Sequence, residues 1–221
     1  ETLIPEYTRG EKREVNPAYK WKANQAAYSR GNGNLERAET IRREMQQLPS
    51  GNPHDPGYRR LRYIRYADDF LLGFIGPLTE AEEIKGRITT FLRTALHLTL
   101  SAAKTLITHA HAGKARFLGY DIGIMHRPDK FDNQRRRVVN GNVGLYIPED
   151  VMHTKRKRYL RDEKPIHRPE LLNDSAYDII ARYQGEYRGL VNYYGLAQNL
   201  ANLDYVRWTM ATSLLKTLAG K

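Results

Sequence analysis

Two adjacent carboxylates, Asp68 and Asp69, stand between two runs of β-branched, aromatic and aliphatic residues within residues 62–75. Such runs favour strands, and a short connection between two strands predicts a β-hairpin with both acids at its tip. Carboxylate oxygens are the ligands that Mg²⁺ prefers, and metal ions beside phosphates serve nucleotidyl transfer. An isolated Asp-Asp pair is more often a turn or a helix cap, so the rest of the chain must decide between the two interpretations. The side chains expected to anchor the hairpin in a sheet are Tyr63, Ile64, Leu71, Leu72 and Phe74.

The charge balance favours a polyanionic partner. The 221 residues hold 36 Lys and Arg against 25 Asp and Glu, a formal net charge of +11. A surplus of this size favours nucleic acid first and an anionic membrane surface second. The sequence has no apolar run of about 18 residues or more, so we predict no membrane contact through a spanning helix. It has no cysteine, which excludes disulfides and thiolate metal sites and fits a reducing compartment.

The chain begins at Glu1 rather than at Met and has no basic-then-apolar leader. We therefore expect it to be a piece of a longer protein. We predict a location in the bacterial cytoplasm or in an organelle, with the cytoplasm favoured.

Two helices are predicted ahead of the hairpin. Asn16 is a suitable N-cap and Pro17 fits the first helical position of a helix that extends to about residue 30. Asn34 is suited to cap a second helix, in which apolar residues recur at helical spacing. We expect the two helices to form a surface hairpin, followed by a stiff loop over residues 49–57.

An α+β sheet is predicted around and after the hairpin. Thr79, with Glu82 three residues later, predicts a capping box. The helix that follows has an apolar stripe, which we expect to lie on the hairpin. Strands are predicted at residues 97–100, 104–108 and 116–124.

The last part of the chain is basic and then helical. An Asn-Gly turn predicts a short hairpin over residues 138–147. Residues 153–168 contain seven Lys and Arg. Two helices are predicted at about residues 175–197 and 204–219, and the apolar stripe of the first includes Ala176 and Ile180. Helices gathered after a sheet predict an α+β fold, a partial sheet with a packed helix followed by a helical region.

Four motifs in order resemble reverse transcriptases encoded by group II introns. Tyr-Ala-Asp-Asp between two strands resembles their catalytic hairpin, and residues 98–107 and 116–121 follow as in that family. Residues 183–194 and 213–219 resemble the thumb, or maturase region. The resemblance covers roughly residues 58–221. It divides the chain into a helical arm (1–57), a palm with catalytic hairpin and primer grip (58–125), and a basic connector with helical thumb or maturase region (126–221).

The resemblance implies RNA-directed DNA synthesis from dNTPs by a two-metal mechanism. Asp68 and Asp69 would bind Mg²⁺, and Lys104 would neutralise phosphate charge or protonate the leaving pyrophosphate. A solvated lysine on a strand edge is the alternative for Lys104. The family's first catalytic aspartate precedes this hairpin, and no acid upstream of it lies in an apolar strand-like run. We therefore expect the chain to need the N-terminal fingers and palm part as a partner.

The resemblance places a primer grip at Phe117, Leu118 and Gly119, where a glycine lets the primer backbone come close. The expected partners are an RNA template, a DNA or RNA primer, and group II intron RNA. A run of charges is usually only a solvated face, but the net charge favours RNA binding here. The nucleic-acid contacts that we predict are Tyr66, Lys155, Arg156, Lys157, Arg158, His167, Arg168, Arg182, Arg188 and Tyr193.

Two other functions remain open on the sequence. One is a non-catalytic maturase clamp, in which the thumb and the basic segment bind intron RNA and assist its folding and splicing. The other is a relative of reverse transcriptases recruited to defence or repair, which the maturase-like thumb disfavours.

Overall fold

The computed structural model of this chain describes residues 2–127, 130–133 and 141–221. They fall into two compact units. Unit 1 comprises Glu1–Ile107 and His126–Asn140, and unit 2 comprises Thr108–Met125 and Gly141–Lys221. Each unit contains helices and strands, so the mixed helix and strand content that we predicted is confirmed. The assignment of palm and thumb, and the division into three segments, stay predictions.

In unit 1, β1 (Arg60–Tyr66) and β2 (Asp69–Ile75) form the predicted antiparallel hairpin. Tyr66 pairs with Asp69, which leaves Ala67 and Asp68 as a two-residue turn. Ala67 has a φ of +53°, the sign that two-residue hairpin turns require at their first position. The local prediction for this stretch is therefore confirmed.

The core of unit 1 lies at the base of this hairpin. Leu61 of β1 is buried with Tyr7 and Ile84. Tyr7 follows α1 (Leu3–Glu6), and Ile84 belongs to α4 (Leu78–Ala95). The predicted packing of this helix on the hairpin is thus observed at Ile84.

The prediction that Tyr63 and Ile64 anchor the hairpin in a sheet is wrong, because both side chains are exposed. Among the described residues the sheet of unit 1 has two strands only, β1 and β2. Of the other predicted anchors, Leu72 and Phe74 pack against the core cluster, and Leu71 is half-buried.

Three predictions around α4 are corrected. The helix begins at Leu78 behind Pro77, whose side chain has no acceptor, so Thr79 does not cap it. At its other end His97 has a φ of +54°, and the N–H of Leu98 donates to the carbonyl of Leu92 (2.9 Å). The chain therefore turns back over the end of the helix. Neither residues 97–100 nor residues 104–108 form a strand.

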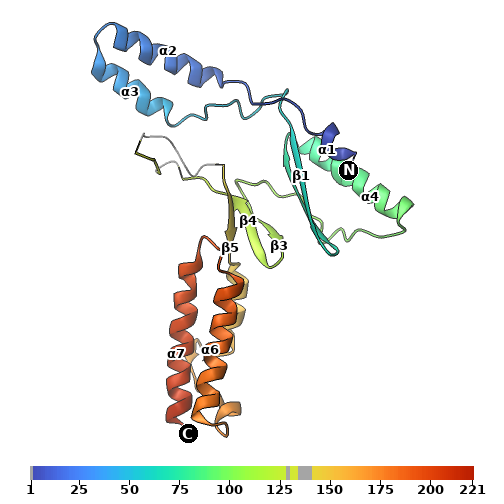
Figure 1. Cartoon of the computed structure of the whole chain (residues 1–221), viewed down its shortest axis with the longest axis vertical. Coiled ribbons are helices and arrows are strands. Elements are labelled where there is room, and N and C mark those ends of the chain that lie inside the picture. The colour runs from blue at the N-terminus through green and yellow to red at the C-terminus, as the bar shows by residue number, and fades with distance from the viewer. Residues whose placement is uncertain (1, 128–129, 134–140) are drawn as a thin grey trace. The chain divides into compact units, whose positions relative to one another are not determined.

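The two predicted helices of the arm are observed as α2 (Pro17–Gly31) and α3 (Leu35–Met45). The side chain of Asn16 accepts from the N–H of Ala18 (3.0 Å), and that of Asn34 from the N–H of Arg37 (3.0 Å). These caps satisfy backbone donors that the helices leave free. The two helices lie side by side as a hairpin (Figure 1).

In unit 2, three antiparallel strands form a sheet in the order β3 (Ala115–Phe117), β4 (Tyr120–Ile124) and β5 (Val143–Tyr146). The predicted single strand over residues 116–124 is wrong, because the chain turns at Leu118 and Gly119. Their φ angles of +47° and +72° are left-handed and cannot continue a strand.

Part of the Asn-Gly hairpin predicted over residues 138–147 lies outside the described residues. From Val143 onward the chain pairs with β4, in a register that sets Ile124 opposite Val143.

The rest of unit 2 is mainly helical. The two C-terminal helices begin and end close to the predicted positions and lie side by side (Figure 1). Among the described residues, no helix combines the length and the apolar character needed to cross a membrane. The elements, in order, are α5 (Glu149–Lys157), β6 (Leu160–Arg161), β7 (Lys164–Pro165), η1 (Pro169–Leu171), α6 (Ala176–Tyr193), η2 (Leu200–Asn202) and α7 (Leu203–Ala219).

The core of unit 2 forms between α6 and α7. Ile179 and Tyr183 of α6 are buried in one cluster with Val206 and Met210 of α7. Burying an aliphatic side chain of this size contributes about 1.5–3 kcal/mol. The predicted stripe, which began at Ala176 and Ile180, is corrected there, because both of these residues are exposed and Ile179 is buried instead.

Candidate nucleic-acid interface

The paired acids lie at the exposed tip of the β1–β2 hairpin. Asp68 is in the turn and Asp69 is the first residue of β2. The Nε of Arg65 donates to the carbonyl of Ala67 (2.5 Å), which supports the left-handed turn. Such a conformation costs an alanine about 1–2 kcal/mol. Strained turns of this kind cluster at functional sites.

Lys104 is exposed in a turn, where its N–H donates to the carbonyl of Ser101 (3.2 Å). It is therefore not on the strand where sequence placed it. Tyr66, at the end of β1, is exposed. In the described part of the chain, no group of three or more His, Cys, Asp and Glu side chains is placed to hold a metal ion. The metal-binding roles of Asp68 and Asp69 stay predictions.

The predicted primer-grip turn is held by two tyrosines from the end of α6. The hydroxyl of Tyr193 donates to the carbonyl of Leu118 (2.8 Å), and that of Tyr194 to the carbonyl of Gly119 (3.2 Å). Phe117 is buried beneath the turn. A Cβ on Gly119 would lie 3.1 Å from the Tyr193 hydroxyl, so the glycine permits this close approach.

Arg116 connects the same sheet to α5 by binding two carboxylates. The guanidinium of Arg116 donates to Asp121 (2.6 Å) and to Asp150 (2.8 Å), the second acid lying in the first turn of α5. These hydrogen bonds raise the pKa of Arg116, the one to Asp150 contributing most, and the same bond lowers the pKa of Asp150. Arg116 therefore fixes α5, whose last turn is basic, relative to the sheet that carries the Leu118–Gly119 turn.

The basic segment divides into exposed and buried members. Arg156 and Arg168 are buried, and their guanidinium groups contact other side chains of unit 2. Neither of these two arginines is therefore proposed as a contact with phosphate. Seven other predicted contacts on this segment and on α6 are exposed, namely Lys155, Lys157, Arg158, His167, Arg182, Arg188 and Tyr193.

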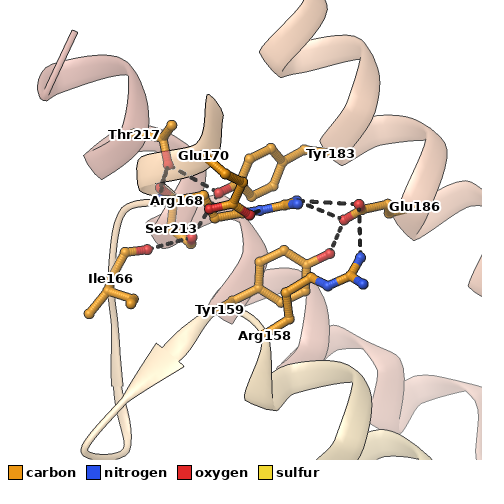
Figure 2. Close-up of polar contacts among 9 residues, drawn as sticks. All are labelled: Arg158, Tyr159, Ile166, Arg168, Glu170, Tyr183, Glu186, Ser213 and Thr217. Carbon is orange, nitrogen blue, oxygen red and sulfur yellow. Dashed lines mark hydrogen bonds and ion pairs between the residues drawn. The ribbon is translucent and has the colours of Figure 1, made fainter. Parts of the chain in front are cut away.

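Glu186 of α6 binds two of the basic side chains, the buried Arg168 and the exposed Arg158 (Figure 2). Its carboxylate accepts from Arg168 (3.1 Å) and from Arg158 (3.3 Å), and it also accepts from the hydroxyl of Tyr159. The ring of Tyr159 is buried, so it is not available to stack on a base. Charged hydrogen bonds of this kind are roughly twice as strong as neutral ones.

The titration of this cluster follows from its contacts. Burial raises the pKa of Tyr159, and the hydrogen bond to Glu186 raises it further. Burial alone lowers the pKa of Arg168, but the hydrogen bond to Glu170 and the charge of Glu186 leave it above its ordinary value. The same hydrogen bond from Arg168 lowers the pKa of Glu170.

A second layer of hydrogen bonds joins the cluster to α7 (Figure 2). The hydroxyl of Tyr183 lies 2.8 Å from that of Ser213 and 3.1 Å from that of Thr217. Thr217 also accepts from the N–H of Arg168 (3.0 Å), and Ser213 donates to the carbonyl of Ile166 (2.5 Å). No buried side-chain polar atom among the described residues lacks a partner, so this is a structural framework behind the exposed basic face.

Sequence reasoning missed Glu186, Tyr205 and Trp208. Glu186 is one of two acids, with Asp178, on a helix with exposed arginines, and no sequence pattern marks it as the partner of Arg158 and Arg168. Tyr205 and Trp208 are spaced three residues apart on α7, which places two rings on the same helix face. That spacing is a signal that the sequence does contain.

Comparison with known proteins supplies the family. Residues 147–221 match the type II intron maturase family. Group II intron-encoded protein LtrA of Lactococcus lactis subsp. cremoris is 38% identical over 177 residues, which cover 73% of this chain and 28% of that protein. The putative COX1/OXI3 intron 1 protein of Saccharomyces cerevisiae is 28% identical over 237 residues, covering 100% of this chain and 28% of that protein.

A third relative is the uncharacterized mitochondrial protein ymf11 of Marchantia polymorpha, 38% identical over 275 residues, which cover 96% of this chain and 36% of that protein. The chain thus spans about a quarter to a third of the length of these relatives. They include a bacterial and a mitochondrial protein, so the comparison does not choose between the two predicted locations.

Proposed function

This chain belongs to the group II intron-encoded maturase family, and from that membership we propose that it takes part in RNA-directed DNA synthesis while unit 2 binds the intron RNA. The observation that carries the proposal is the β1–β2 hairpin, which presents Asp68 and Asp69 together at an exposed two-residue turn. Both carboxylates are therefore accessible to metal ions and to a nucleic-acid end.

In the proposed reaction Asp68 binds Mg²⁺ directly, and Asp69 is a second contributor. Mg²⁺ held by these carboxylates would supply charge stabilisation as the primer 3′-hydroxyl displaces pyrophosphate from the α-phosphate of a dNTP. A further carboxylate comes from the N-terminal palm part of the complete protein. Lys104 lies in the same unit as the pair and is the candidate for charge neutralisation.

Primer extension tests this proposal. A poly(rA)/oligo(dT) duplex with Mg²⁺ and dTTP is supplied to this chain alone, and then to this chain with the N-terminal fingers and palm part added. We expect extension only with both pieces. Asp68→Asn or Asp69→Asn should lower the rate by at least about a hundredfold, since each removes metal-ion stabilisation of several kcal/mol.

The matched control is Asp162→Asn, which changes an exposed acid in the turn between β6 and β7. This variant should extend the primer at the original rate. Undiminished synthesis by Asp68→Asn and Asp69→Asn would show that the metal site lies elsewhere.

The second candidate function is a non-catalytic RNA clamp. The exposed basic side chains of α5 and α6 favour it, because they lie in the residues that match the maturase family and need no metal. Affinity for intron RNA should fall steeply with salt, and removal of one phosphate contact, as in Arg188→Ala, should reduce the slope of log K against log salt by about 1. If Asp68→Asn with Asp69→Asn leaves splicing assistance intact and abolishes synthesis, the two functions are separate.

A further inference from the structure

Two aromatic side chains form an exposed stacked pair on α7. Tyr205 and Trp208 lie one turn apart, with ring planes within 6° of parallel and centroids 6.4 Å apart. Each residue is 57% exposed. Single exposed aromatic residues are common on protein surfaces. A stacked parallel pair is a more specific feature, because it presents aromatic ring faces to solvent in one orientation.

A buried arginine supports this surface from behind. The guanidinium carbon of Arg156 lies 3.7 Å from the centroid of the Tyr205 ring. Its Nε donates to the hydroxyl of Thr209 (3.2 Å), and that hydroxyl donates to the carbonyl of Tyr205 (2.9 Å). Arg156 is 9% exposed and Thr209 is fully buried. One face of the Tyr205 ring is therefore covered by a fixed cation, and the rest of the residue is open.

The charges on α5, next to Arg156, favour an anionic ligand. Lys155 and Lys157, the neighbours of Arg156 on α5, are both exposed. The nearest acid on the helix, Asp204, is paired with Arg207 (3.2 Å). A flat aromatic surface beside cations matches an unstacked nucleobase with its phosphates, since bases stack on aromatic rings regardless of sequence. An apolar protein segment would need no such cations.

We propose that Tyr205 and Trp208, supported by Arg156, form a stacking site for an unpaired RNA base, with Lys155 and Lys157 binding the adjoining phosphates. The proposal rests on the RNA-binding part of the function above and adds a site and a ligand class to it. The sequence predicted that Arg156 contacts phosphate. In this proposal Arg156 instead holds the Tyr205 ring in place.

Trp208 fluorescence reports on this site directly. The chain has two tryptophans, so Trp21→Phe leaves Trp208 as the only one. In this background we expect oligo(A) of about ten nucleotides to quench Trp208, and an abasic ribose-phosphate oligomer of the same length to leave it unchanged. In the full chain, Trp208→Ala should weaken oligo(A) binding about tenfold, the effect of losing one base–aromatic stack, with an unchanged salt slope. Trp208→Tyr should restore affinity to within about twofold.

The matched control is Leu215→Ala, which truncates another exposed apolar side chain on α7. It should bind oligo(A) like the original chain. Equal weakening by both truncations, or equal quenching by the abasic oligomer, would overturn the stacking site and leave RNA binding itself standing. Absence of binding to either oligomer would overturn the proposed RNA binding as well. A Trp208 signal that follows protein concentration, with a dimer in sedimentation, would assign the surface to a second copy of the chain.

Discussion

The hydroxyl of Tyr193 donates to the carbonyl of Leu118 across 2.8 Å, although the two residues are 75 positions apart in the chain. The contact joins the end of α6 to the left-handed turn between β3 and β4. The turn carries the predicted primer grip, and α6 carries predicted RNA contacts. Within unit 2, the two proposed nucleic-acid elements are therefore one connected structure.

Removing the two tyrosine hydroxyls should loosen this turn. We expect Tyr193→Phe with Tyr194→Phe to lower the free energy of unfolding of unit 2 by about 1–2 kcal/mol, because two carbonyls lose their donors. Urea denaturation followed by Trp208 fluorescence, in the Trp21→Phe background, measures the change. Tyr177→Phe on α6 is the control, because Tyr177 is 80% exposed, and it should leave the midpoint unchanged. A double variant as stable as the original chain would show that water replaces both donors.

Gly119 is required by conformation and by space. Gly119→Ala should cost about 1 kcal/mol for the φ of +72°, and more because the new Cβ lies 3.1 Å from the Tyr193 hydroxyl. Gly141→Ala is the matched control. Gly141 also has a positive φ, +89°, but no described atom lies within 4 Å of the position that its Cβ would take. The same denaturation assay should show the larger loss at Gly119. Equal losses would mean that only backbone strain matters there.

Glu186 should be the more important of the two acids that bind Arg168. Glu186→Gln leaves a buried arginine without its inner carboxylate, and we expect a loss of about 2 kcal/mol in the free energy of unfolding. Glu170→Gln removes an acid whose side chain is 55% exposed, so the loss should stay below about 1 kcal/mol. Urea midpoints of the two variants compare them. The reverse order would show that Glu170 is the principal partner.

Asp55 should make the stability of unit 1 depend on pH. Its carboxylate accepts from the N–H of Glu14 (2.7 Å) and of Gly57 (2.8 Å). The Glu14 hydrogen bond contributes most to lowering its pKa. The folded pKa lies below the unfolded one, so this stability is present above the unfolded pKa of about 4 and is lost as pH falls through the folded pKa.

Urea midpoints between about pH 5 and pH 3 test this dependence. Trp21 fluorescence in a Trp208→Phe background follows unit 1. The midpoint should fall as the pH is lowered, and the fall should be smaller in Asp55→Asn, which has no carboxylate to protonate. The same fall in both proteins would show that other carboxyl groups account for it.

The sequence predicted local structure correctly where the hydrogen-bond partners lie within the same short stretch of chain. Asn16 and Asn34 cap helices whose donors lie two or three residues away, and β1 and β2 pair across a two-residue turn. These features were predictable because propensity, capping and turn sterics act over a few residues. The strands predicted at residues 97–100 and 104–108 had suitable residues. Among the residues that the structure describes, however, no neighbouring strand satisfies their backbone groups, and a strand requires one.

The sequence by itself determined the hairpin with Asp68 and Asp69, the two C-terminal helices and the basic character of the chain. Only the tertiary structure decided which side chains face inward. Ile179 and Ile180 both fit helical spacing with Tyr183, and packing against α7 selects Ile179. Arg156 is one of several similar basic residues, and it is buried because Thr209 and Tyr205 lie beside it. A side chain's burial depends on partners that are distant in sequence, and local patterns contain no information about them.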